Sequence, residues 1–233
     1  TVAFIMGAVM GLSMGPLYSS MAADLTTFAT SFPEAMVAMF GGGDMSTPEG
    51  FLHIETMGMM GPIAVIIVAT AAASAGVAGE EQAGRFAILL AAPVSRARVY
   101  WTTALVVAAY VAVVVLSLFL GLWAGIALGG LEVEIGNVAA ACLLLACLGW
   151  FFGGLALLLS AVSGRPGVAV WGTTGVAVVA YFGYTLLMAA GREELGWWSP
   201  FRAHLYGPPL EAGVEWWQPT WLLVGAAALA LLG

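Results

Sequence analysis

The stretch VYWTTALVVAAYVAVVVLSLFLGLWAGIAL, Val99 to Leu128, determines the fold class because it is apolar throughout and carries no charged residue. About 20 such residues in a helix cross the roughly 30 Å of hydrocarbon in a bilayer, where backbone polar groups cannot be left unpaired. The stretch therefore predicts a transmembrane helix. The whole chain agrees, since 62% of its 233 residues are hydrophobic and only 8% are charged. An ordinary soluble domain has about one quarter charged residues.

Similar apolar runs recur along the chain and predict an all-α membrane protein with a single transmembrane domain over residues 1–233. The six predicted spans cover approximately residues 2–21, 54–78, 99–128, 138–162, 167–190 and 220–233. The chain opens inside an apolar run and the last run is too short to cross a bilayer, so we expect both terminal helices to be truncated. Between the spans we expect a short helix at 79–95 and outer loops at 22–53 and 191–219.

The positions of the arginines predict how the chain is oriented, because short cytoplasmic loops collect basic residues. The chain has no lysine. If the first span runs outward, the inner side carries Arg85, Arg96, Arg98 and Arg165, and the outer side carries Arg192 and Arg202. Of the 13 acidic residues, only Glu80 and Glu81 then lie on the inner side. We therefore expect both chain ends in the cytoplasm.

The net charge of −7 and the absence of a basic patch argue against nucleic acid as a partner. Alanine, glycine and arginine without lysine favour a GC-rich bacterial source, and hence the inner membrane. His53 and His204 lack partners at metal-ligand spacing, so we expect no metal site and interpret both as loop or interface histidines. Cys142 and Cys147 lie on different faces of the fourth span, so we expect small buried hydrophobic residues rather than a disulfide.

The polar segment between the second and third spans combines a helix start, an apolar stripe and a stop. Glu80 and Glu81 place negative charge where a helix begins, and Pro93 ends the pattern. Its apolar positions recur at helical spacing: Phe86, Leu89 and Leu90. Such a helix could rest its stripe in lipid, or it could dock on a soluble partner. Periodicity does not distinguish these two interpretations.

Three stretches resemble one family, the type-two ATP-binding cassette (ABC) exporter permeases with six spans. AGEEQAGRFAILLAAPVSRARVY (78–100) resembles the coupling segment of that family. TPEGFLHIETMGMMGPIAVII (47–67) resembles its outer loop and the start of its second span, and WWSPFRAHLYGPPLEAGVEWW (197–217) resembles its last outer loop. The resemblance extends over nearly the whole chain, and the first motif is the most specific of the three.

The resemblance implies that the chain exports a hydrophobic or amphipathic substrate, such as a drug, an antibiotic or a lipid-like molecule. It also implies a second permease half, in a homodimer or heterodimer, and a separate ABC ATPase that binds ATP and Mg. The ATPase-coupling residues implied are Glu80, Glu81, Gly84, Arg85, Leu89, Leu90, Pro93 and Arg96, although many relatives have threonine in place of Arg85.

The residues themselves support a chain without its own catalytic site or cofactor. A phosphate-binding Gly-rich loop requires a lysine, which this chain lacks, so ATP hydrolysis must come from a partner. The alternatives are a membrane scaffold, a mechanotransmission subunit acting on an outer-face partner, or an intramembrane enzyme. An enzyme would need a reactive cluster, and no such motif is present in the sequence.

Two further sets of residues are candidates for assembly and transport. Gly7, Gly11 and Gly15 repeat every four residues, which permits close helix packing, and we expect this ridge to face the dimer partner. Packing within one subunit is the alternative. The middle of the four inner spans has no ionisable residue, which disfavours a proton-coupled mechanism. We place Trp171, Thr174 and Tyr181 on a substrate path, with ordinary lipid contact as the alternative for each.

Overall fold

The computed structural model describes residues 2–29, 43–76 and 95–233, and every regular element in them is helical. The longer elements are α1 (Val2–Ala29), α4 (Gly61–Ser74), α7 (Arg96–Gly129), α8 (Ile135–Ser163), α9 (Pro166–Ala189) and α12 (Trp217–Leu232). The shorter ones are α3 (Pro48–Leu52), the π-helix η1 (His53–Met60), the 3-10 helix η3 (Glu193–Gly196), α10 (Pro200–Leu205) and α11 (Pro209–Ala212). Five helical stretches are long and apolar enough to span a membrane, and α12 is a shorter apolar helix. These findings confirm an all-α membrane protein.

Local sequence explains where the helices begin and end. Thr47 starts the second helical stretch, because its side chain accepts a hydrogen bond from the Gly50 amide (3.1 Å) and Pro48 follows it. The stretch then continues through α3, η1 and α4, so it begins before the predicted residue 54. Ser95 caps α7, and Gly130 ends it in the left-handed conformation with φ of 63°.

The first span is longer than predicted. We expected it to end at residue 21 and an outer loop to occupy 22–53, but α1 continues to Ala29. Polar residues within the last turns of α1 made this part of the sequence resemble a loop. The apolar pattern located the centre of each span more reliably than its ends.

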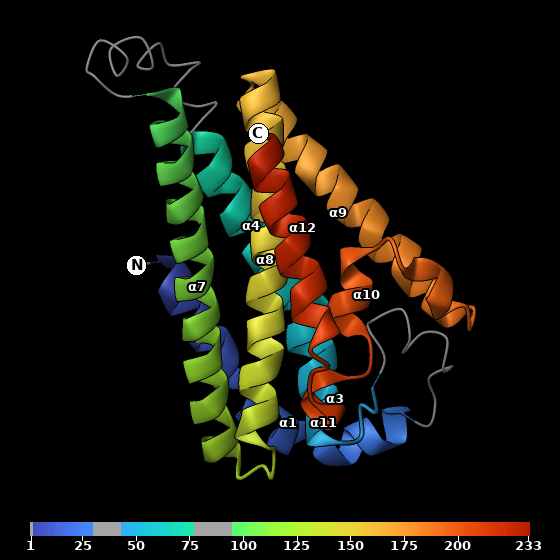
Figure 1. The fold of residues 1–233 in the computed structure, drawn as a ribbon. Helices are drawn as coiled ribbons and strands as arrows, with labels where there is room; N and C mark the ends of the chain where they lie inside the picture. Colours follow the sequence, from blue (N-terminus) through green and yellow to red (C-terminus); the bar gives the residue numbers. More distant parts are fainter. Residues whose placement is uncertain (1, 30–42, 77–94) are drawn as a thin grey trace.

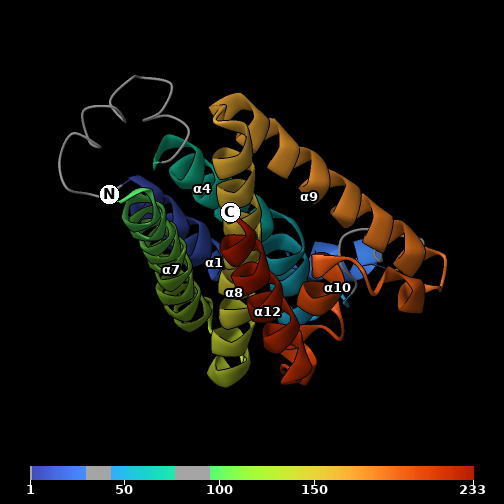
Figure 2. The ribbon, with the colours of Figure 1, turned by 45° about the horizontal axis from the view of Figure 1, so that its top comes forward.

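The bundle is organised around α8, which has the largest buried share of the five long helices. It contacts α4, α7, α9 and α12, whereas α1 packs against α7 at the edge of the bundle. Figures 1 and 2 show α12 lying along α8, with α7 on one side and α9 on the other. Helix α9 leans away from α8 toward its C-terminal end, and α10 lies beside it there. This divergence sets the position of the candidate site.

The glycine ridge of α1 faces α7 of the same chain. A Cβ atom on Gly11 would lie 2.6 Å from the carbonyl oxygen of Leu118, and Gly7 and Gly15 likewise face Ser117 and Gly125. These contacts match the alternative of packing within one subunit. The expectation that Gly7, Gly11 and Gly15 face a dimer partner therefore needs correction, because α7 already occupies that face at backbone distance.

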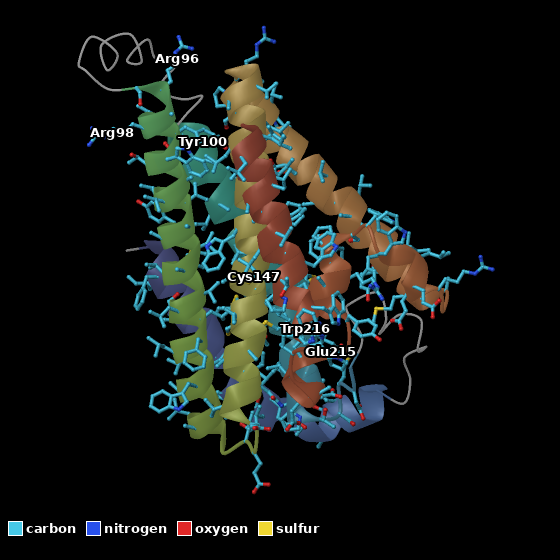
Figure 3. All side chains as sticks on the ribbon, in the orientation of Figure 1. Arg96, Arg98, Tyr100, Cys147, Glu215 and Trp216 are labelled. Atoms are coloured by element: carbon cyan, nitrogen blue, oxygen red, sulfur yellow. The ribbon has the colours of Figure 1, made fainter. Side chains whose placement is uncertain are left out.

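Arg96, Arg98 and Arg165 lie at one end of the bundle, and several acidic residues lie at the other. Figure 3 shows Arg96 and Arg98 at one end and Glu215 toward the other. Helices α7 and α8 are consecutive and run in opposite directions, so the turn holding Arg165 lies at the same end as Arg96. Glu132 and Glu134 lie in the turn at the opposite end. We call these the arginine end and the acidic end.

Candidate substrate cavity between α4 and α9

A cavity of about 470 Å³ lies between α4 and α9, where the two helices diverge. Residues from α4 form one wall and residues from α9 form the other. Met59 of η1 and Phe201 of α10 complete it. The lining residues are Met59, Pro62, Ile63, Ile66, Ile67, Thr70, Ala71, Val170, Thr174, Ala177, Val178, Tyr181, Phe182 and Phe201.

Helix α10 fills the gap between the diverging helices and bounds the cavity toward the acidic end. Ser199 caps α10 and also donates its hydroxyl hydrogen to the carbonyl oxygen of Ala180 in α9 (2.8 Å). The Phe201 ring packs edge-on against Tyr181, with centroids 5.2 Å apart, and against Phe152 of α8 at 5.7 Å. The cavity wall is therefore fixed by contacts to both neighbouring helices.

Two further hydrogen bonds hold the segment around α10 against the bundle. His204 donates from Nε2 to the carbonyl oxygen of Met57 in η1 (2.9 Å), and Gln218 of α12 donates to the carbonyl oxygen of Tyr206 (2.9 Å). Both His53 and His204 are buried, which corrects their interpretation as loop or interface residues. The pKa of His204 is lowered to about 4, chiefly by burial; the Met57 hydrogen bond opposes the shift, and the neighbouring His53 adds to it.

The cavity is apolar with a few hydroxyl groups. No charged side chain lines it, and its polar groups come from Thr70, Thr174 and Tyr181. Thr70 is 4% exposed, and its Oγ1 has no hydrogen-bond partner among the described residues. A buried hydroxyl without a partner is unfavourable, so a ligand with a hydrogen-bonding group would be stabilised there. The cavity suits an uncharged or amphipathic molecule.

The structure separates the three residues predicted for a substrate path. Thr174 and Tyr181 line the cavity. Trp171 does not line it and is 76% exposed on the outer surface of α9. Its high exposure matches the lipid-contact alternative, although position 171 lies three residues before Thr174 on the same helix.

Thr70, Met59 and Phe201 were missed by the sequence reasoning. Thr70 gave a weak signal, as a hydroxyl within an apolar run of alanines. No sequence signal pointed to Phe201, because α10 comes into contact with η1 and α9 only in the folded chain.

A second cavity of about 650 Å³ lies between α1, α4 and α7. Aliphatic residues and methionines line it, among them Met6 and Met10 of α1. Ile67 of α4 borders both cavities, so they occupy adjacent faces of that helix. The lining of the second cavity offers no polar side chain to orient a ligand.

Most of the predicted coupling residues fall outside the described part of the chain. These are Glu80, Glu81, Gly84, Arg85, Leu89, Leu90 and Pro93. Arg96 is described, and it is the exposed first residue of α7 at the arginine end. Within residues 2–29, 43–76 and 95–233, no group of three or more His, Cys, Asp or Glu side chains is arranged to hold a metal ion.

Comparison with known proteins agrees with this architecture of apolar helices around a hydrophobic cavity. No curated protein and no solved structure matches the chain. One family does match, over residues 1–233, and its description is "Multidrug efflux system permease Rv1217c, C-terminal domain". Because this match covers every residue of the chain, the protein belongs to this family of efflux permeases, and its role is transport across a membrane.

Proposed function

We propose that the chain is the transmembrane half of an ABC exporter in the bacterial inner membrane, driven by a separate ATPase. In this proposal it moves hydrophobic or amphipathic molecules out of the cytoplasm or the inner leaflet. The observation that carries the proposal is the uncharged cavity between α4 and α9, within a chain of the efflux permease family. A second permease half would complete the path, and ATP with Mg would bind only in the ATPase.

The position of the predicted coupling segment supports an ATPase at the arginine end. The segment joins the end of α4 to the start of α7, and Arg96 and Arg98 lie at that end. Arginine-rich ends of membrane helices face the cytoplasm, where ATP is available. Movement of a docked ATPase would then act on α4, which forms one wall of the cavity.

The coupling role is tested by replacing both Glu80 and Glu81 with alanine. The matched control replaces the other adjacent glutamate pair, Glu193 and Glu194, at the opposite end. In cells that also contain the ATPase, we expect Glu80→Ala/Glu81→Ala to reduce dye efflux by about tenfold or more, because charged docking contacts contribute roughly 1.5–3 kcal/mol. The control should transport normally. Equal efflux by both variants at equal membrane abundance would contradict ATPase coupling through this segment.

The cavity is tested separately by filling it. Ala177 lines the cavity and is buried, whereas Val179 on the same helix is exposed and does not line it. We expect Ala177→Trp to reduce efflux and dye binding in proportion to the volume filled, while Val179→Trp leaves both unchanged. Binding measured on purified protein without ATPase distinguishes loss of the substrate site from loss of coupling. Normal binding by Ala177→Trp would place the substrate elsewhere.

A further inference from the structure

Arg202 is held between two aromatic rings in the segment that follows α9. Its Cζ atom lies 5.3 Å from the ring centroid of Tyr206 and 5.3 Å from that of Trp217. The two rings are themselves 5.7 Å apart at an interplanar angle of 64°. Its Nε atom is buried and has no hydrogen-bond partner among the described residues. These contacts fix the guanidinium and leave its terminal amines as the groups able to reach a ligand.

The positive charge of Arg202 is not paired in an ion pair within the part of the chain that the structure describes. Its side chain forms no hydrogen bond or ion pair with any described residue. Glu215 lies close by, but its Oε2 accepts a hydrogen bond from Trp217 Nε1 (2.8 Å) and makes no ion pair with Arg202. A partly buried charge without a partner is costly, so an anion at this position would be stabilised.

The surroundings place this charge at the level of lipid headgroups. Trp216 is 81% exposed, and Trp197 and Trp198 are also exposed. All three lie in the segment that connects the end of α9 to the start of α12. Exposed tryptophans of membrane proteins gather at the interface between hydrocarbon and water. A planar guanidinium binds a phosphate through two parallel hydrogen bonds, which favours phosphate over a simple point charge.

We propose that Arg202, Tyr206 and Trp217 form a binding site for the phosphate of an anionic phospholipid in the leaflet at the acidic end. The acidic end also argues for a lipid source of the phosphate. Its carboxylates, including Glu132, Glu134 and Glu211, repel any anion, but a lipid offsets this repulsion through apolar contact with the exposed tryptophans, which a soluble anion does not make. The site is independent of the substrate cavity and of ATPase coupling.

The test measures which lipids stay bound to the purified protein. Wild type, Arg202→Gln and Arg202→Lys are exchanged into detergent with equal amounts of phosphatidylglycerol and phosphatidylcholine, and bound lipid is counted by native mass spectrometry. The control is Arg192→Gln, which removes the exposed arginine at the same end of the bundle. We expect wild type and the control to retain phosphatidylglycerol about tenfold over phosphatidylcholine, because both lipids offer a phosphate but Arg202 repels the choline ammonium that cancels the phosphate charge. Arg202→Gln should lose the preference, and Arg202→Lys should retain part of it.

If a variant fails to fold, the lipid retention of wild type alone still tests the proposal. Equal retention of the two lipids by wild type would overturn it, as would an unchanged preference in folded Arg202→Gln. In a parallel experiment, inorganic phosphate is added to the purified protein and the thermal unfolding midpoint is measured. Stabilisation by inorganic phosphate without lipid preference would overturn the lipid assignment, whereas lipid preference without such stabilisation supports it.

Discussion

At the scale of single residues, two of the buried threonines, Thr70 and Thr185, differ in hydrogen bonding and should respond oppositely to the same substitution. Thr70 Oγ1 has no partner, whereas Thr185 donates to the carbonyl oxygen of Tyr181 (3.1 Å). We expect Thr70→Val to raise the free energy of unfolding by about 1 kcal/mol and Thr185→Val to lower it by roughly 0.5–1 kcal/mol. Thermal unfolding in detergent measures both changes. An equal loss in both variants would show that the Thr70 hydroxyl has a partner.

The same substitution tests the cavity chemistry at this scale. If the Thr70 hydroxyl contacts substrate, Thr70→Val should weaken binding of a dye with a hydrogen-bonding group by about tenfold, because one such bond contributes roughly 1.5 kcal/mol. Binding of a purely apolar dye should be unchanged. The comparison of two dyes distinguishes a lost hydrogen bond from a distorted cavity.

His204 makes the packing of α10 dependent on pH. Its pKa is about 4 in the folded protein, below the value of 6.5 for an unperturbed histidine. The folded state therefore favours the neutral ring. The contribution of neutral His204 to the free energy of unfolding is complete above pH 6.5 and is lost as the pH falls toward 4. We expect wild type to lose about 2 kcal/mol of stability between pH 7 and pH 5 through this residue.

The control for the pH effect is His204→Gln, which keeps a polar side chain but does not titrate. Its unfolding midpoint should change less between pH 7 and pH 5 than that of wild type. Equal changes in both proteins would assign the pH dependence to other groups, among them the neighbouring His53.

At the scale of elements, helix packing depends on where glycine allows close approach. A Cβ atom on Gly11 of α1 would lie 2.6 Å from Leu118 O and 2.5 Å from Leu122 N, whereas one on Gly175 of α9 would meet nothing within 4 Å. We expect Gly11→Ala to destabilise the protein by about 1–3 kcal/mol through separation of α1 from α7. Gly175→Ala should be neutral or stabilise by up to about 1 kcal/mol, because alanine favours helix. Thermal unfolding of the two variants measures the difference, and equal midpoints would contradict close α1–α7 packing.

The helices also show which features of the fold can be predicted from the sequence alone. Apolar runs located the spans. A segment in hydrocarbon must be helical to pair its backbone polar groups, and its side chains must be apolar, so a long run of valine and leucine is visible in the sequence itself. Helix ends were less predictable: residues 48–53 were assigned to the outer loop, although the helical stretch already begins at Pro48. Which face meets which neighbour depends on contacts distant in sequence. Gly11 was therefore assigned to a dimer although it faces α7, and of the three residues assigned to a substrate path, Thr174 and Tyr181 line the cavity and Trp171 does not.

At the scale of the whole molecule, orientation links the proposed ATPase site to the charge distribution. Ala97 at the arginine end and Glu132 at the acidic end are both exposed, and the native Cys142 and Cys147 are buried. A membrane-impermeant maleimide should therefore label Glu132→Cys in intact cells and Ala97→Cys only after permeabilisation, with little background from wild type.

The labelling result bears on the mechanism as well as on topology. The segment between α4 and α7 can dock on an ATPase only if the arginine end faces the cytoplasm, since ATP is not available outside. The reverse labelling pattern would place that segment outside the cell and exclude ATPase docking there, whatever the cavity binds. The expected pattern together with normal efflux by Glu80→Ala/Glu81→Ala would keep the topology. It would move the coupling contact to other residues at the arginine end, where Arg96, Arg98 and Arg165 are exposed.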